Sequence, residues 1–178
     1  MQLDEVKLIF EYTQWIGQNI LQQTRLVSEE EYTAKTAYGI GFQSLRGTLV
    51  HLVDTVYGWR LICEGHFSQS GTQADYDATG IDESMLPTRE ALVARWHEEY
   101  QAMTDYIHSL DQARLDGVVH YVIPENIVRE RPLWHVLYHV VNHATQHLSE
   151  AAALLTIYGH SPGDIDFTRF MNERTKHS

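Results

Sequence analysis

Apolar residues recur every three or four positions along four long stretches of this chain, the spacing of one face of an α-helix. In the second stretch, for example, Leu45, Leu49 and Leu52 form such a stripe. The stretches run from about 3 to 27, 44 to 64, 88 to 110 and 131 to 158. Because four amphipathic helices bury their apolar faces against one another, the sequence predicts an all-α fold, a four-helix bundle.

The connections between these helices differ in composition. The segments 29–44 and 65–80 are polar and predict loops. Between Gly117 and Glu130, two short β-branched runs flank a Pro-Glu turn, which predicts a small β-hairpin or an irregular excursion before the last long helix. Arg131-Pro132 is expected to open that helix and Gly159 to close it, and the C-terminal segment is expected to form one more turn or a short helix.

Composition limits the classes of function. The chain has 178 residues, which predicts one domain over 1–178, and its 13 Lys+Arg against 24 Asp+Glu give a net charge of −11. That charge argues against nucleic acid and anionic membrane surfaces as partners. We find no apolar run long enough to span a membrane and no basic signal-peptide start, and the single cysteine, Cys63, excludes an internal disulfide. We expect a cytoplasmic protein.

Four histidines, His135, His139, His143 and His147, follow one another at four-residue spacing in the last long helix. Each step of four advances about 40° around a helix, so the four cannot all face one point. The aliphatic stripe of this helix places His143 and His147 toward the bundle interior. His139 borders the interior, and His135 is expected to reach solvent or a neighbouring chain.

Two inward imidazoles one turn apart favour a metal site, because buried polar side chains need partners and this spacing suits one ion. The alternative is that each histidine forms a hydrogen bond with a core carbonyl or hydroxyl group. A third ligand must come from another helix. His51, among apolar residues of the second helix, is the natural candidate, although it falls at the edge of that helix's apolar stripe.

Three neutral imidazoles with an open coordination position are typical of a catalytic site. Zn is the best match, and Ni, Mn, Fe and Co also accept imidazole. Water or a thiol in the open position would become a nucleophile. Asp54 and Glu150 each follow a predicted ligand by three residues and, with His139, are candidates for acid–base or supporting roles. The alternative for both carboxylates is a solvated position beside a cation.

The sequence resembles the DinB/YfiT-like family of metal-binding four-helix bundles. The resemblance rests on HLVDTVYGW from His51, on HVVNHATQHLSEAAALL from His139, and on the closing PGDIDFTRF. It implies a divalent metal ion on His51, His143 and His147. Members of the family include S-transferases that use low-molecular-weight thiols, an isomerase of a thiol conjugate and proteins assigned as hydrolases.

Two functions follow as expectations. The first is a metal-dependent enzyme, a thiol S-transferase or a hydrolase, which acts on a small-molecule substrate. The second is a non-catalytic dimeric bundle that binds a metal or another ligand. We expect a homodimer, partly from the resemblance and partly because Trp134, His135 and Tyr138 are large residues that lie off the apolar stripe.

Overall fold

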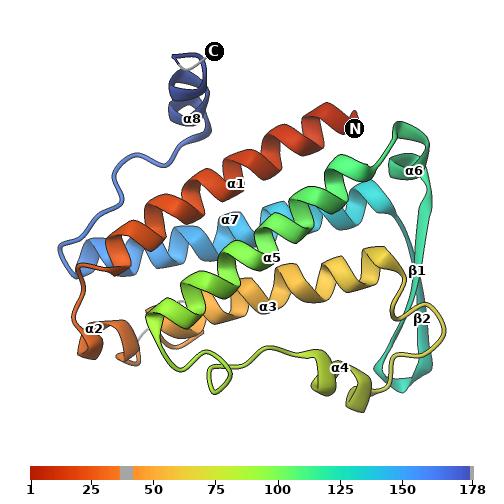
Figure 1. The fold of residues 1–178 in the computed structure, drawn as a ribbon, viewed down its shortest axis with the longest axis horizontal. Helices are drawn as coiled ribbons and strands as arrows, with labels where there is room; N and C mark the ends of the chain where they lie inside the picture. Colours follow the sequence, from red (N-terminus) through yellow and green to blue (C-terminus); the bar gives the residue numbers. More distant parts are fainter. Residues whose placement is uncertain (37–41, 177–178) are drawn as a thin grey trace.

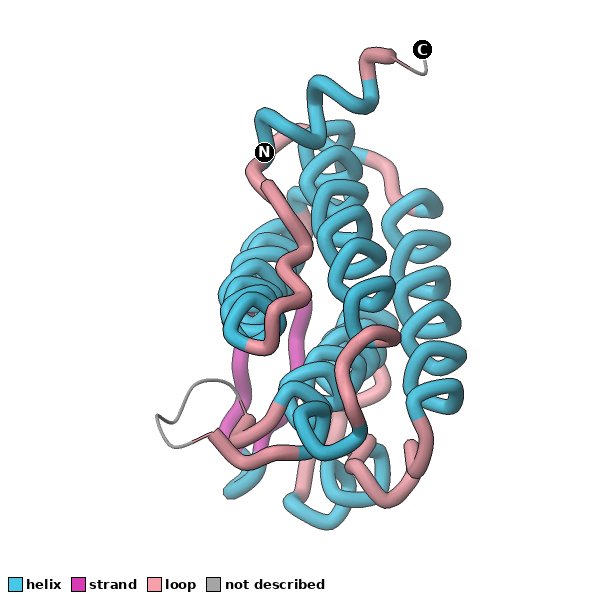
Figure 2. The backbone as a smooth tube through the Cα atoms, turned by 90° about the vertical axis from the view of Figure 1, so that its left-hand side faces the viewer, coloured by secondary structure: helices cyan, strands magenta, loops and turns pink. Residues whose placement is uncertain are grey.

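A computed structural model of the protein describes residues 1–36 and 42–176. Four long helices build it, as the sequence predicts (Figure 1). They are α1 (Leu3–Thr24), α3 (Leu45–Glu64), α5 (Arg89–Ser109) and α7 (Leu133–Ile157). Helix α7 packs against α1 and α3, and α5 packs against α3 and α1, in one bundle (Figure 2). The buried side chains of the four helices form one apolar core. The predicted all-α four-helix bundle is therefore confirmed.

The long helices begin and end at residues whose chemistry suits a helix terminus. The Ser44 hydroxyl accepts a hydrogen bond from the Gly47 N–H at 2.9 Å, and Thr88 caps α5 in the same way. Gly65 takes the left-handed conformation, with φ of 90°, that ends α3. One boundary differs from the prediction. Pro132 ends a β-strand and precedes the first turn of α7, so Arg131-Pro132 does not lie within the helix.

The core depends on close approach of helices as well as on apolar side chains. Trp96 of α5 is 1% exposed and stacks on Tyr100. Its ring lies against Gly17 of α1, where an added Cβ would stand 2.6 Å from Trp96 Cζ2. Gly17 therefore allows α1 and α5 to approach closely enough to enclose the indole ring.

Besides a 3-10 turn at Pro124–Asn126 in the hairpin, the described chain has four short α-helices. They are α2 (Glu29–Thr33), α4 (Gln73–Thr79), α6 (Gln112–Asp116) and α8 (Phe167–Arg174). The prediction of continuous loops over 29–44 and 65–80 was wrong where α2 and α4 form; residues 37–41 of the first loop lie outside the described part. Helix α2 begins with a reciprocal cap between Ser28 and Glu31, and α4 begins with one between Thr72 and Asp75.

The predicted hairpin is confirmed. Strand β1 (Val118–Ile123) pairs antiparallel with β2 (Ile127–Pro132), and Tyr121 lies directly opposite Arg129. The hairpin is joined to the loop after α3, because the Val122 N–H donates a hydrogen bond to the Phe67 carbonyl at 2.8 Å. In this position it lies beside one end of α3 and beside α4 (Figure 1).

In residues 1–36 and 42–176, we find no helix that combines the length and the apolar character needed to cross a lipid bilayer.

Candidate metal centre

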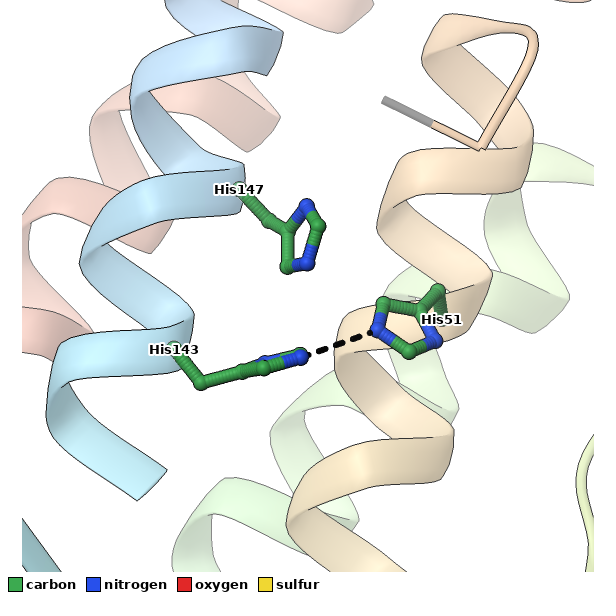
Figure 3. A group of neighbouring side chains, drawn as sticks. All are labelled: His51, His143 and His147. Carbon is green, nitrogen blue, oxygen red and sulfur yellow. Dashed lines mark hydrogen bonds between the residues drawn. The ribbon is translucent and has the colours of Figure 1, made fainter. Parts of the chain in front are cut away.

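Three histidines from two helices meet between α3 and α7 (Figure 3). His143 and His147 lie on successive turns of α7, and His51 faces them from α3. One ring nitrogen from each residue lies within 4.8 Å of the other two. These are the three residues that the sequence predicts as ligands, and the structure brings them together.

The other two members of the histidine series do not join this cluster. His147 is 8% exposed and His143 is half-buried, whereas His139 and His135 are exposed. The ring of His139 lies 5.0 Å from that of Trp59, and the ring of His135 lies 4.0 Å from that of Trp134. The drift of 40° per four residues therefore separates the histidines as the sequence predicts.

The cluster has the donor atoms that a divalent ion requires. The Nε2 atoms of His51 and His143 lie 3.2 Å apart. Without an ion, one of these nitrogens must carry a proton and donate it to the lone pair of the other. Two imidazoles bound to one Zn²⁺ at 2.0–2.1 Å in tetrahedral geometry have their nitrogens about 3.3 Å apart. The observed spacing matches this value. Imidazole nitrogens also suit the other divalent transition metals.

Glu150 fixes the orientation of the third ring. Its Oε2 lies 2.6 Å from Nδ1 of His147. Because an ionised carboxylate only accepts hydrogen bonds, His147 donates its Nδ1 proton, which leaves a lone pair on Nε2. This is the carboxylate–histidine pair found behind many metal-bound imidazoles.

The environment keeps two of the imidazoles neutral. Burial, with the neighbouring histidines as a smaller cause, lowers the pKa of His51 and of His143 to about 4. At neutral pH these rings therefore carry lone pairs rather than a positive charge. The Thr55 hydroxyl lies 3.3 Å from His51 Nε2, within hydrogen-bonding distance of that atom.

Phe42 covers one side of the cluster. Its ring is stacked on His51 with centroids 3.6 Å apart, and it meets the edge of His147 at 5.6 Å. Phe42 was not predicted as a site residue, because the polar segment in which it precedes α3 has no periodicity. Its contact with the histidines appears only when α3 and α7 are side by side.

A cavity of about 780 Å³ lies beside the histidines. His51 and His143 form part of its wall, and the rest comes from α3, α4, the hairpin and the loops on either side of α4. Trp59, Tyr121 and Arg129 face the same space. Tyr121 and Arg129 were not predicted from the sequence, since only the folded hairpin places them there.

The three candidates for acid–base or supporting roles have different surroundings. Asp54 lines the cavity, and its Oδ1 accepts the Ile81 N–H at 2.7 Å. Burial raises the pKa of Asp54. Glu150 contacts His147, and His139 packs on Trp59. Among residues 1–36 and 42–176, neither carboxylate is paired with Lys or Arg, so the alternative of a solvated carboxylate beside a cation does not describe them.

Comparison with known proteins gives one match. The model of the DinB family matches residues 1–177, which is nearly the whole chain. A search of curated proteins finds no match. The match and the histidine cluster are together compatible with the binding of a metal ion.

Proposed function

This chain belongs to the DinB family, and on that premise we propose that it is a metal-dependent enzyme acting on a small molecule at His51, His143 and His147. These residues would hold one divalent ion, Zn before Ni, Mn, Fe or Co. A bound ion with an open position lowers the pKa of a coordinated water or thiol, so the reaction would be hydrolysis or S-transfer.

The cavity beside the histidines is the observation that carries this proposal. A structural metal site is closed by four protein ligands, whereas a catalytic site has three ligands and access for substrate. Here three histidines converge, and two of them form the wall of a space of about 780 Å³. That volume is within the range of small-molecule sites and could hold a low-molecular-weight thiol together with its electrophile. A bundle that held only a structural metal ion would need no such space, which is why we favour the enzyme.

Three side chains beside the histidines have a part in the proposed reaction. Glu150 orients His147 through the Nδ1 hydrogen bond. Phe42 excludes water from one side of His51. Asp54 uses Oδ1 to accept the Ile81 N–H, so Oδ2 is available to take a proton from the attacking water or thiol. Of the three candidates for proton transfer, Asp54 is the one that shares the cavity with His51 and His143.

Metal content tests the ligand assignment. We expect about one equivalent of divalent metal in the wild-type protein by elemental analysis, and little in H51A, H143A or H147A. The matched control is H135A, on the same helix but turned away, which should keep the metal. Thermal unfolding by circular dichroism shows whether each variant is folded, and H143Q repeats the test with a larger side chain. Equal metal content in H143A and H135A would contradict the assignment.

Two activity assays then separate the reactions. The first follows conjugation of a small thiol to 1-chloro-2,4-dinitrobenzene, and the second follows hydrolysis of 4-nitrophenyl esters. We expect one of them to depend on the metal and to fail in H143A but not in H135A. If the metal-loaded protein has neither activity, the non-catalytic function is favoured.

A further inference from the structure

Arg129 is a cation in the cavity wall that has no acidic partner in the part of the chain that the structure describes. It lies on β2 opposite Tyr121, and the side chains of directly opposite residues are on the same face of a hairpin. Tyr121 is buried and lines the cavity, and Arg129 is half-buried beside it. Within residues 1–36 and 42–176, the Arg129 guanidinium makes no hydrogen bond or ion pair with another side chain.

This state is unusual for the protein. Five arginines are half-buried in the described part of the chain, and the other four each contact a glutamate. The pairs are Arg46–Glu83, Arg60–Glu99, Arg89–Glu29 and Arg95–Glu99. In a chain with a net charge of −11, acids are plentiful, yet none of the described ones forms an ion pair with Arg129. A half-buried guanidinium loses part of its hydration, so a bound anion can replace the water that it lacks.

The acids that line the cavity already have partners of their own. Asp54 accepts the Ile81 N–H, Asp77 accepts the Gln73 side-chain amide at 2.7 Å, and Asp82 accepts the N–H and hydroxyl groups of Ser84. The rest of the wall is rich in aromatic side chains, among them Trp59 and Tyr121. The cavity therefore offers one unpaired cation at the hairpin, apolar surface between, and the histidines on the helical side.

We propose that Arg129 binds a carboxylate of the substrate, so that the site selects small molecules with a carboxylate at the end remote from the histidines. A guanidinium matches a carboxylate with two parallel hydrogen bonds. A monoanion suits this cavity better than a phosphate dianion, because one arginine would face two negative charges while Asp54, Asp77 and Asp82 repel them. The inference rests on the proposed function, in which the reacting group binds at the histidines.

The test uses thiols as probes of both ends of the site. The protein is loaded with Co²⁺, and thiol binding is followed by the sulfur-to-cobalt absorption band. ω-Mercaptocarboxylates from 3-mercaptopropionate to 6-mercaptohexanoate are each compared with the ω-mercaptoalcohol of the same length. At the length that reaches Arg129, we expect the carboxylate to bind about tenfold more tightly than the alcohol.

Variants locate the source of this preference. R129Q should lose it while binding the alcohols as the wild type does, and R129K should keep part of it. R131Q is the matched control: Arg131 is two residues away on the same strand and lines a different, smaller cavity, so R131Q should keep the preference. Circular dichroism confirms that each variant is folded.

The outcomes separate this proposal from the proposed function. If Co²⁺ binds and both probe series bind equally, or if R129Q keeps the preference, the assignment of Arg129 is wrong and the metal site stands. If the protein takes up no Co²⁺, the proposed function fails, and the inference about Arg129 falls with it.

Discussion

Glu150 Oε2 lies 2.6 Å from His147 Nδ1, one helical turn further along α7. The separation of three residues puts the two side chains on one face of the helix, so a local interaction sets the tautomer of a residue in the candidate site. His51 and His143 show no comparable contact with a carboxylate in the part of the chain that the structure describes. Glu150 is thus the strongest supporting residue of the centre.

Replacing Glu150 by Gln should weaken metal binding without unfolding the protein. Gln can still accept the Nδ1 proton through its carbonyl oxygen, but it no longer makes the imidazole more basic. We expect the metal dissociation constant to rise about 10- to 100-fold, measured by competition with a chromophoric chelator. The control is Q146A, an exposed position one turn earlier on α7. An unchanged dissociation constant in E150Q would remove Glu150 from the site.

The stability of the metal-free protein should fall as the pH is lowered from about 6.5 to about 4. His51 and His143 have a folded-state pKa of about 4 and an unfolded value near 6.5. In this window the unfolded chain binds protons that the folded chain does not, so acid favours unfolding. Urea denaturation at several pH values measures the slope. The double variant H51Q/H143Q should show a shallower slope, and a slope equal to that of the wild type would count against this assignment.

Replacing Asp54 by Asn should lower turnover and leave the metal in place. Asn keeps an oxygen that can accept the Ile81 N–H, so the loop after α4 should stay in position. If Asp54 Oδ2 receives the proton, the rate should fall about 10²- to 10⁴-fold in D54N. In the wild type, the rate should rise with pH through the pKa of Asp54, which burial raises. A pH–rate profile of D54N with the wild-type acidic limb would contradict this role.

Two glycine substitutions should have opposite effects on stability, because Gly17 lies at the close contact between α1 and α5 and Gly58 has open space beside it. G17A should lower the free energy of unfolding by about 1–3 kcal/mol, because the new methyl group would overlap the Trp96 ring. G58A is the control, since a Cβ at Gly58 in the middle of α3 meets nothing within 4 Å. It should raise the free energy of unfolding by about 0.5–1 kcal/mol. Chemical denaturation measures both, and a stable G17A variant would show that Trp96 can shift.

We also expect the protein to form a homodimer through the outer face of α7. Tyr138 is 50% exposed there, beside the exposed His135 and the half-buried Trp134. Sedimentation equilibrium should give a mass twice the 20.6 kDa of the chain. Y138E should shift the mass toward the monomer, whereas M85E, at a position 56% exposed elsewhere, should not. A wild-type mass of one chain at micromolar concentration would exclude this dimer.

The sequence by itself determined the four long helices and the direction of the histidines on the last one. Both depend on periodicity within one helix: residues three or four apart share a face whatever the helix packs against. The same local rule identified Glu150 as a neighbour of His147. The short helices α2 and α4 were missed although Ser28 and Thr72 carry capping signals, because helices of this length depend on packing for their stability.

Only the tertiary structure decided which residues share the site. His51 and His143 are 92 positions apart, and their contact depends on how α3 is rotated against α7. Phe42, Arg129 and the Ile81 N–H that binds Asp54 come from loops and a hairpin, where no periodicity indicates direction. Periodicity sets where a side chain points around its own helix axis. Which partner it meets depends on the packing of all the apolar faces together, and that is a property of the whole fold.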